Sequence, residues 1–229
     1  MNESDTIAAP RLIVFDLDGT LVDSKQGIAR CFNGALAAVA GVALVPPERV
    51  YMMIGLPLSQ MFHDALPAAD DALVEALIAH YRVQYDLIEV PRTLPFPGVL
   101  ATLTACRAAG IRLSVATTKG QRVADAVVDA AGLRPYLALV LGGDSVPNHK
   151  PAPDLVLRTL AELAIAPEDA LVVGDSSYDM LMAANAKVRA VGVTYGTQPA
   201  EALRAAGACR LIDALPALLP LLRLASLEG

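Results

Sequence analysis

Short apolar runs that alternate with segments of helical length constrain the fold of this chain most. The runs cover residues 111–117, 136–142, 170–175 and 188–193. Strands that are apolar throughout, rather than at every second residue, are typical of a parallel sheet covered by helices on both faces. The stretch RLIVFD near the N-terminus has the same character. The pattern therefore predicts an α/β fold with a Rossmann-like parallel sheet that includes this first strand.

One long segment interrupts the alternation. Residues 25–92 carry apolar residues at helical spacing and contain no convincing strand. The proline-rich stretch TLPFPGV then returns the chain to the alternating pattern. We therefore expect a discontinuous core made of residues 8–22 and 93–224, with residues 23–92 inserted after the first strand as a helical cap domain.

The charge balance argues against several classes of function. The 229 residues include 18 Lys and Arg against 24 Asp and Glu, a net charge of −6, with no basic cluster. A nucleic-acid partner would favour a basic surface, so we expect none. The polar, acidic N-terminus does not resemble a signal peptide, and the longest uncharged run is too short and too broken by Pro and Gly to span a bilayer. We expect no membrane association and a cytoplasmic location.

The three cysteines show no paired spacing of the kind that binds a metal. Cys31, Cys106 and Cys209 are scattered unevenly along the chain. We interpret them as small buried side chains in a reducing compartment.

Two carboxylates end the most apolar strand. In the sequence DLDGT, Asp16 and Asp18 are two residues apart, a spacing that directs both side chains to the same side of a strand. At about 5 Å and an effective dielectric of about 20, their repulsion is roughly 3 kcal/mol. A soluble protein tolerates such a pair where a cation offsets it.

The other runs also end in polar residues. Parallel strands present their carboxyl ends at one edge of the sheet, where ligands bind. The residues expected at this edge, besides the two acids of the first strand, are Thr117, Thr118, Lys119, Lys150, Asp175 and Asp179. Clustered carboxylates form an oxygen-ligand site for a hard divalent cation such as Mg²⁺. The sequence therefore predicts a magnesium site in which a lysine also offsets the negative charge.

These residues also carry a family resemblance. DLDGTLVDS, Thr117, Lys150 and GDSSYD, in this order, resemble the four motifs of the haloacid dehalogenase-like (HAD) phosphatases. The match extends from about Leu12 to Val193, and the helical insert resembles the C1-type cap of that superfamily. The resemblance implies Mg²⁺-dependent hydrolysis of a small phosphate monoester through an aspartyl-phosphate.

The resemblance also implies a role for each acid. Asp16 would be the nucleophile that attacks phosphorus, and Asp18 the general acid that protonates the leaving group and then the base that activates water. The metal would be held by Asp16, the backbone carbonyl of Asp18 and Asp175, with Asp179 close by.

Other residues would bind the substrate. By the same resemblance, Thr117 and the amides of Leu17 and Thr118 would contact the phosphoryl oxygens, assisted by the helix that opens near Gly120. Lys119 comes directly after Thr118, and we expect it to bind the substrate as well. Lys150 would neutralise charge on the nucleophile and the transferring group. Gly19 would leave room for the chain to turn away beneath the site.

Each residue also has a simpler structural interpretation. Thr117 could be an ordinary strand residue, Asp175 a helix N-cap and Lys150 a surface lysine. His149 could touch a substrate, although a structural role is the simpler interpretation.

The substrate is the least determined feature. LVDS after the first motif and the segment GGDSVPNHKPAPD favour the phosphoglycolate phosphatases, whereas Thr118 stands where Asn is common in that subfamily. Other sugar phosphates, nucleotides, pyrophosphate and β-phosphoglucomutase-like transfer are alternatives within the same chemistry. A signalling module that carries phosphate on Asp16, or an inactive binding protein, is the alternative from another class.

Phosphoglycolate would bring a second anion, its carboxylate, into an acidic site. The cations of the insert and its hinge are Lys25, Arg30, Arg49, Arg82 and Arg92. We expect Arg30 or Lys25 to contact the carboxylate, and the loop of residues 53–57 to fix substrate size. The protein could be a monomer or a homodimer.

Overall fold

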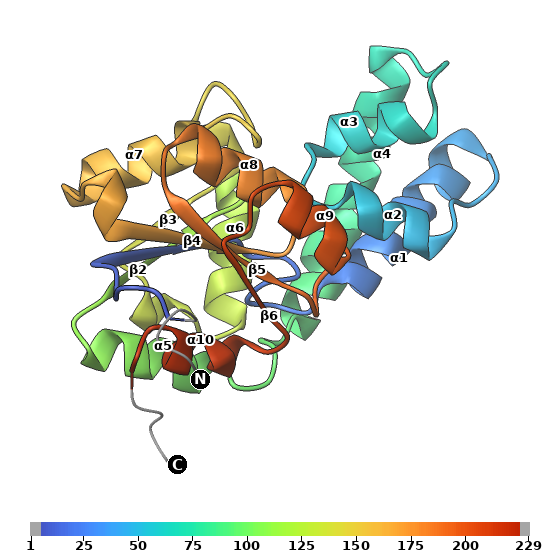
Figure 1. Cartoon of the computed structure of the whole chain (residues 1–229). Coiled ribbons are helices and arrows are strands. Elements are labelled where there is room, and N and C mark those ends of the chain that lie inside the picture. The colour runs from blue at the N-terminus through green and yellow to red at the C-terminus, as the bar shows by residue number, and fades with distance from the viewer. Residues whose placement is uncertain (1–5, 225–229) are drawn as a thin grey trace.

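A computed structural model describes residues 6–224, in which six parallel strands form one sheet (Figure 1). The order across the sheet is β3-β2-β1-β4-β5-β6. The strands are β1 (Leu12–Phe15), β2 (Arg112–Ala116), β3 (Leu139–Leu141), β4 (Ala170–Gly174), β5 (Arg189–Val193) and β6 (Arg210–Ile212). The prediction of an α/β fold with a Rossmann-like parallel sheet is confirmed.

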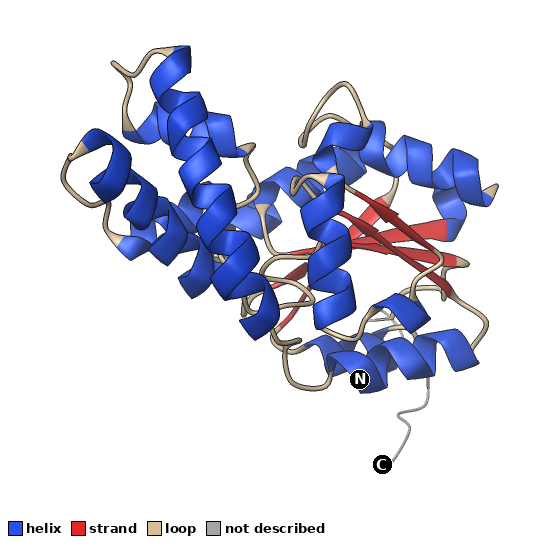
Figure 2. Ribbon diagram, turned by 180° about the vertical axis from the view of Figure 1, so that it is seen from behind, coloured by secondary structure: helices blue, strands red, loops and turns tan. Residues whose placement is uncertain are grey.

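Helices cover both faces of this sheet (Figure 2). They are α5 (Val99–Ala108), α6 (Gln121–Ala130), α7 (Asp154–Leu163), α8 (Ser177–Asn185), α9 (Ala200–Ala205) and α10 (Leu218–Leu221). Alternate residues of β1 enter different buried clusters, with Ile13 and Phe15 on one side and Leu12 and Val14 on the other. A strand buried on both faces needs apolar residues at every position, which explains the uninterrupted run in the sequence.

A separate group of helices lies beside the sheet, between β1 and α5 in the chain (Figure 1). These are α1 (Lys25–Ala35), α2 (Pro47–Met53), α3 (Leu58–Ala65) and α4 (Asp71–Gln84), followed by the π-helical turn Tyr85–Glu89 and the 3-10 turn Val90–Arg92. Within the described chain, no strand falls in residues 25–92. We call residues 25–92 the helical region. Its position matches the expected insert, while the domain boundaries stay a prediction.

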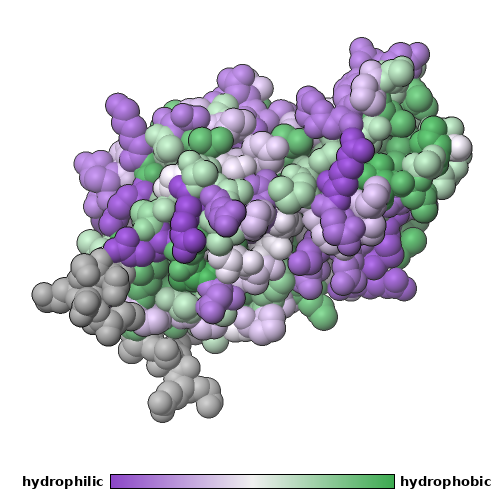
Figure 3. Space-filling view, turned by 45° about the vertical axis from the view of Figure 1, so that its right-hand side comes forward, coloured by the Kyte–Doolittle hydropathy of each residue, from purple (hydrophilic) through white to green (hydrophobic). Residues whose placement is uncertain are grey.

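The helical region has its own apolar packing. The rings of Phe32 in α1 and Phe62 in α3 stack with their centroids 4.4 Å apart. Both belong to the same buried cluster as Phe15, so apolar contact continues from the helical region to the sheet. At the right-hand side of Figure 3, further hydrophobic side chains lie on the outer surface of the protein. Exposed apolar residues of this region include Val39, Val42, Leu44 and Met52.

The structure differs from the sequence predictions in three respects. The edge strand β6 was not expected, because three residues are too few to show a periodicity. The run 136–142 forms a strand only at Leu139–Leu141, and residues 134–136 form a 3-10 turn. The prediction of three buried cysteines is wrong for Cys209, which is exposed.

No helix in residues 6–224 is both long enough and apolar enough to cross a membrane.

Candidate active site

The strand register brings the predicted residues to one edge of the sheet. Phe15 lies opposite Val115 of β2 and Val173 of β4. Asp16, Thr117 and Asp175 therefore all emerge just beyond the carboxyl ends of three adjacent strands. Three segments far apart in the sequence meet here because parallel strands present the same end to this edge.

The turn after β1 depends on Gly19. This residue has a φ of +81°, a left-handed conformation that side chains other than glycine rarely adopt. A Cβ atom at this position would also overlap the carboxylate of Asp175. Gly19 is therefore needed for the turn and for the close approach of Asp175.

Lys150 lies between two of the predicted acids. Its Nζ donates to Oδ1 of Asp16 and to Oδ1 of Asp179, each at 2.6 Å. Burial alone would lower the pKa of Lys150, but the two carboxylates outweigh it and raise the pKa above its usual range. The lysine is therefore a buried, charged ammonium and not a surface side chain.

Three carboxylates converge beside Lys150. Asp16, Asp175 and Asp179 are all buried, and each offers an oxygen within 4.8 Å of the others. Burial raises the pKa of Asp16 well above its ordinary value, with Lys150 opposing the rise. Burial, with repulsion from Asp179, also raises the pKa of Asp175 to about 6. One lysine does not fully offset this charge, and a set of carboxylate oxygens suits Mg²⁺.

Hydrogen bonds hold Asp175 and Asp179 in place. The backbone N–H and hydroxyl of Thr197 donate to Oδ2 of Asp175 at 2.8 and 2.6 Å, and the Thr20 hydroxyl donates to its Oδ1 at 3.2 Å. Oδ2 of Asp179 accepts from the hydroxyl and the N–H of Ser176 at 2.6 and 3.1 Å, in a capping box at the start of α8. Sequence reasoning missed Thr197, which lies in a loop without a recognisable motif.

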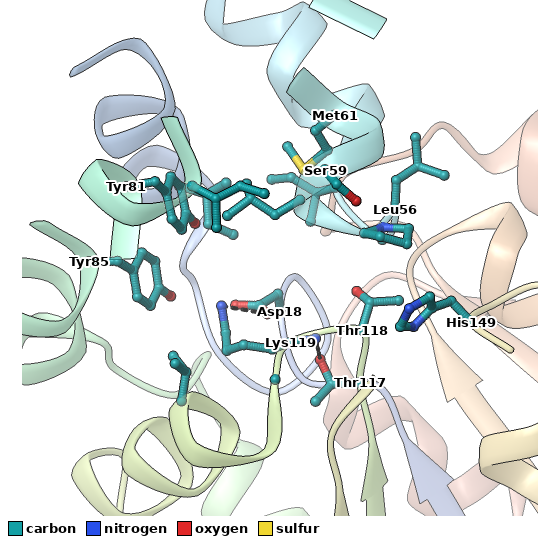
Figure 4. A pocket seen from close by; sticks show the side chains of 18 of the residues that line it. Asp18, Leu56, Ser59, Met61, Tyr81, Tyr85, Thr117, Thr118, Lys119 and His149 are labelled. Carbon is teal, nitrogen blue, oxygen red and sulfur yellow. Dashed lines mark hydrogen bonds and ion pairs between the residues drawn. The ribbon is translucent and has the colours of Figure 1, made fainter. Parts of the chain in front are cut away.

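Asp18 is held by two side chains. The Ser24 hydroxyl donates to Oδ1 at 2.5 Å, and Lys119 Nζ lies 3.1 Å from Oδ2. Ser24 occupies the N-cap position of α1, but among the described residues its side chain bonds Asp18 and does not cap the helix. Figure 4 shows Lys119 directed toward Asp18. Sequence reasoning identified neither contact of Asp18.

The residues after β2 lie where a phosphoryl group was expected to bind. Thr117 is buried, its N–H donates to the carbonyl of Leu141 at 3.1 Å, and its hydroxyl oxygen accepts from the N–H of Lys119 at 3.2 Å. The expected help from the N-terminus of α6 is reduced, because the N–H of Gln121 donates to Asp144 at 2.7 Å.

A cavity of about 320 Å³ opens above this edge (Figure 4). Its polar side is lined by Asp16, Asp18, Thr117, Thr118, Lys119 and Asp175. Its opposite side comes from the helical region, which contributes Ser59, Glu75, Arg82 and Asp86 together with nine apolar or aromatic residues: Ile28, Ile54, Leu56, Pro57, Leu58, Met61, Ile78, Tyr81 and Tyr85. We call these nine residues the apolar wall. His149 also lines the cavity and lies near Thr118 in Figure 4.

The structure contradicts the expectation that Arg30 or Lys25 binds a substrate carboxylate. Neither is among the described residues that line the cavity. Arg30 pairs with the buried Glu89 at 2.9 Å, and Lys25 Nζ donates to the carbonyl of Gly196 at 3.4 Å. The charge of Arg30 is therefore paired with an acid, whereas Lys25 contacts a backbone carbonyl outside the cavity. The loop of residues 53–57 does contribute Ile54, Gly55, Leu56 and Pro57 to the cavity lining.

Comparisons with known proteins agree with this arrangement. The sequence pattern of the haloacid dehalogenase-like hydrolase family matches residues 13–193. The chain belongs to this family. Several of its curated relatives are named phosphatases, and the chain is a phosphatase of this family.

Two curated relatives illustrate the similarity. The chain is 37% identical over 206 residues to "Probable phosphatase IndB" of Dickeya dadantii, covering 88% of this chain and 89% of the relative. It is also 37% identical over 194 residues to a phosphoglycolate phosphatase of Agrobacterium fabrum, covering 81% of each.

A solved structure shows the same fold. A predicted phosphoglycolate phosphatase from Haemophilus somnus superposes with a TM-score of 0.83 at 27% identity, covering 96% of this chain and 99% of that chain.

Proposed function

We propose that this protein is a Mg²⁺-dependent hydrolase of small phosphate monoesters that acts through an aspartyl-phosphate on Asp16. The observation that supports this most is the position of Asp16, which lines the cavity while Lys150 contacts its Oδ1 at 2.6 Å. That contact would leave the second carboxylate oxygen for attack on phosphorus. Asp175 and Asp179 are the other acids that would hold the metal, together with the Asp18 carbonyl.

The first step would transfer the phosphoryl group to Asp16. Its carboxylate oxygen forms a bond to phosphorus as the bond to the leaving oxygen breaks, and Asp18 gives that oxygen a proton. Ser24 and Lys119 hold the Asp18 carboxylate in place for this transfer. Lys150 and the Thr117 hydroxyl would offset charge on the phosphoryl oxygens. Bound Mg²⁺ would neutralise charge on the acids and on the phosphoryl group.

The second step would release phosphate. Asp18, now deprotonated, takes a proton from water, the water oxygen bonds to phosphorus, and the bond from phosphorus to Asp16 breaks. The same side chain thus acts as acid and then as base, which returns the site to its starting state.

Phosphoglycolate is the first candidate substrate, because several relatives carry the name phosphoglycolate phosphatase. The site also fits other small esters, since its polar side recognises the phosphoryl group. We expect a small-molecule partner and no nucleic acid. A cytoplasmic location and a monomeric or homodimeric state stay predictions.

The test is phosphate release from a panel of phosphoglycolate, a sugar phosphate, a nucleotide, pyrophosphate and p-nitrophenyl phosphate, with Mg²⁺ present. Acid-quenched reactions are digested and analysed by mass spectrometry for phosphate on the peptide that contains Asp16. We expect phosphate release and a transient modification there. Release without any modification of that peptide would rule out the covalent route, and Asp16→Asn provides the matched control.

A further inference from the structure

Lys119 is the cation that faces the reaction centre from the cavity. Its side chain is 11% exposed, and its Nζ lies 3.1 Å from Asp18 Oδ2 and 4.2 Å from the ring centroid of Tyr85. The first contact comes from the turn after β1 and the second from the helical region. Two contacts from different elements fix the ammonium group, so little ordering is needed when a ligand anion binds it.

The position of Asp18 determines what Lys119 can reach. The leaving oxygen must come within about 2.8 Å of the Asp18 carboxylate to receive its proton. A carboxylate on the carbon next to that oxygen lies about 3 Å further on, given carbon–carbon and carbon–oxygen bonds of about 1.5 Å. This distance is within ion-pair reach of Lys119, and a longer spacer would carry the anion away from it.

Other cations are less suited to this role. Lys150 is already held between Asp16 and Asp179, on the side of the nucleophile. Arg82 also lines the cavity, but its side chain is exposed to solvent. A carboxylate bound without Lys119 would face the charges of Asp16 and Asp18 directly.

The rest of the cavity has a different chemistry. Its volume of about 320 Å³ extends from the polar residues at the sheet edge to the apolar wall. The short glycolate group of phosphoglycolate would fill only the part beside Lys119. Leu56, Met61 and Tyr81 lie above Asp18 and Lys119 in Figure 4. Met61 and Tyr81 are already largely buried, whereas Leu56 is half-buried, and such a small ligand would not reach them. An apolar substituent would contact all three and cover the exposed part of Leu56.

We infer that this site takes phosphate esters of 2-hydroxy carboxylates, whose carboxylate pairs with Lys119 and whose side chain packs on the apolar wall. The inference rests on the proposed phosphatase activity and deepens it. Phosphoglycolate is the smallest member of this class, and members with an apolar side chain use the whole cavity.

The test compares four esters in two pairs. Phosphoglycolate is matched with ethyl phosphate, and 2-phospho-3-phenyllactate with 2-phenylethyl phosphate, so that each pair differs in the carboxylate. Within each pair, we expect kcat/KM to be at least tenfold higher for the ester that carries the carboxylate. Between the pairs, we expect kcat/KM to be at least tenfold higher for the ester that carries the phenyl group than for the ester of the same charge without it. Equal values within either comparison would overturn the corresponding half of the inference.

A variant of Lys119 tests whether this residue causes the preference for esters that carry a carboxylate. In Lys119→Met, which keeps the length of the side chain but not its charge, all four rates should fall because Asp18 loses a contact. The ratio within each pair should also fall, from tenfold or more to about one. Lys25→Met removes a cation that does not line the cavity and should leave the ratios unchanged. An equal loss for all four esters would show that Lys119 only positions Asp18 and would overturn its role as the carboxylate partner.

The wild-type panel keeps the inference testable even if Lys119→Met does not fold. If wild-type protein hydrolyses none of these esters, nor p-nitrophenyl phosphate, then the proposed phosphatase function itself has failed. If it hydrolyses them without preference, then only the substrate class is wrong.

Discussion

The two sides of the cavity are built in opposite ways. At the sheet edge, the acids and Lys150 are buried and have defined partners, such as the 2.6 Å contacts from Lys150 to Asp16 and Asp179. On the facing side, the apolar wall consists of apolar and aromatic side chains from α1, α3, α4, the π-helical turn Tyr85–Glu89 and the loop before α3. The difference leads us to expect that the chemistry depends on individual atoms of the sheet edge, whereas the fit of a substrate's apolar part depends on the shape of the helical region.

The largest effect is expected at Asp16, the proposed nucleophile. Asp16→Asn should lower kcat by about 10⁴-fold or more for every ester, because an amide is a poor nucleophile. The measurement is single-turnover phosphate release, with thermal unfolding as the control for folding. Turnover within tenfold of wild type would falsify the assignment of Asp16.

Removal of the proposed Mg²⁺ should have the second-largest effect. Excess chelator is expected to lower the rate about a thousandfold, equivalent to roughly 4 kcal/mol of transition-state stabilisation, and added Mg²⁺ should restore it. Asp175→Asn should raise the Mg²⁺ concentration for half-maximal rate more than Asp179→Asn, because Asp175 lines the cavity and Asp179 does not. Full activity in chelator would contradict the metal site.

The effect of replacing Asp18, the proposed general acid, should depend on the leaving group. Asp18→Asn is expected to slow alkyl esters by about 10²- to 10⁴-fold, and p-nitrophenyl phosphate less in the first step, because its leaving group needs less protonation. The phospho-enzyme should persist, since the second step loses its base. Burst kinetics separate the two steps, and an equal loss for every ester in both would argue against this role.

A change in the apolar wall should alter selectivity rather than chemistry. Leu56→Trp fills part of the cavity and should lower kcat/KM for 2-phenylethyl phosphate by about tenfold, while ethyl phosphate changes little. Val83→Trp is the matched control, because Val83 lies on the exposed surface of α4. If Leu56→Trp slowed both esters equally, the separation between chemistry and selectivity would be wrong.

The smallest effect on turnover is expected at Arg30. Arg30→Met leaves the carboxylate of Glu89, whose side chain is only 8% exposed, without this partner, so the free energy of unfolding should fall by about 1 to 3 kcal/mol. KM for phosphoglycolate should stay within about twofold of wild type, since Arg30 does not line the cavity. A tenfold rise in KM would return Arg30 to the substrate site.

The sequence revealed the sheet edge better than the helical region. Asp16, Thr117 and Asp175 could be found because each follows an apolar strand, and strand ends of a parallel sheet must meet. Thr197 and Ser24 could not, because their contacts with Asp175 and Asp18 depend on how loops and the first inserted helix come to rest.

The helical region was harder for a related reason. Helical spacing identifies which residues are buried, but it does not say whether they face the core or a cavity. Arg30 seemed available for a ligand from its position one turn into α1, yet Glu89, 59 residues later, lies within 2.9 Å of it. Such a long-range pair leaves no local pattern in the sequence.

The use of the Ser24 side chain has a consequence for engineering. A serine at a helix start usually bonds the amides of its own first turn, and loss of such a cap costs about 1 kcal/mol. Here the hydroxyl bonds Asp18 instead, so α1 begins without this stabilisation. A stabilising redesign that placed Asp at this position, so that its side chain could accept from the first amides of α1, would set a carboxylate against Asp18. Thermostability and catalytic competence therefore compete for one hydroxyl group, a trade-off that position-by-position optimisation of helix caps would overlook.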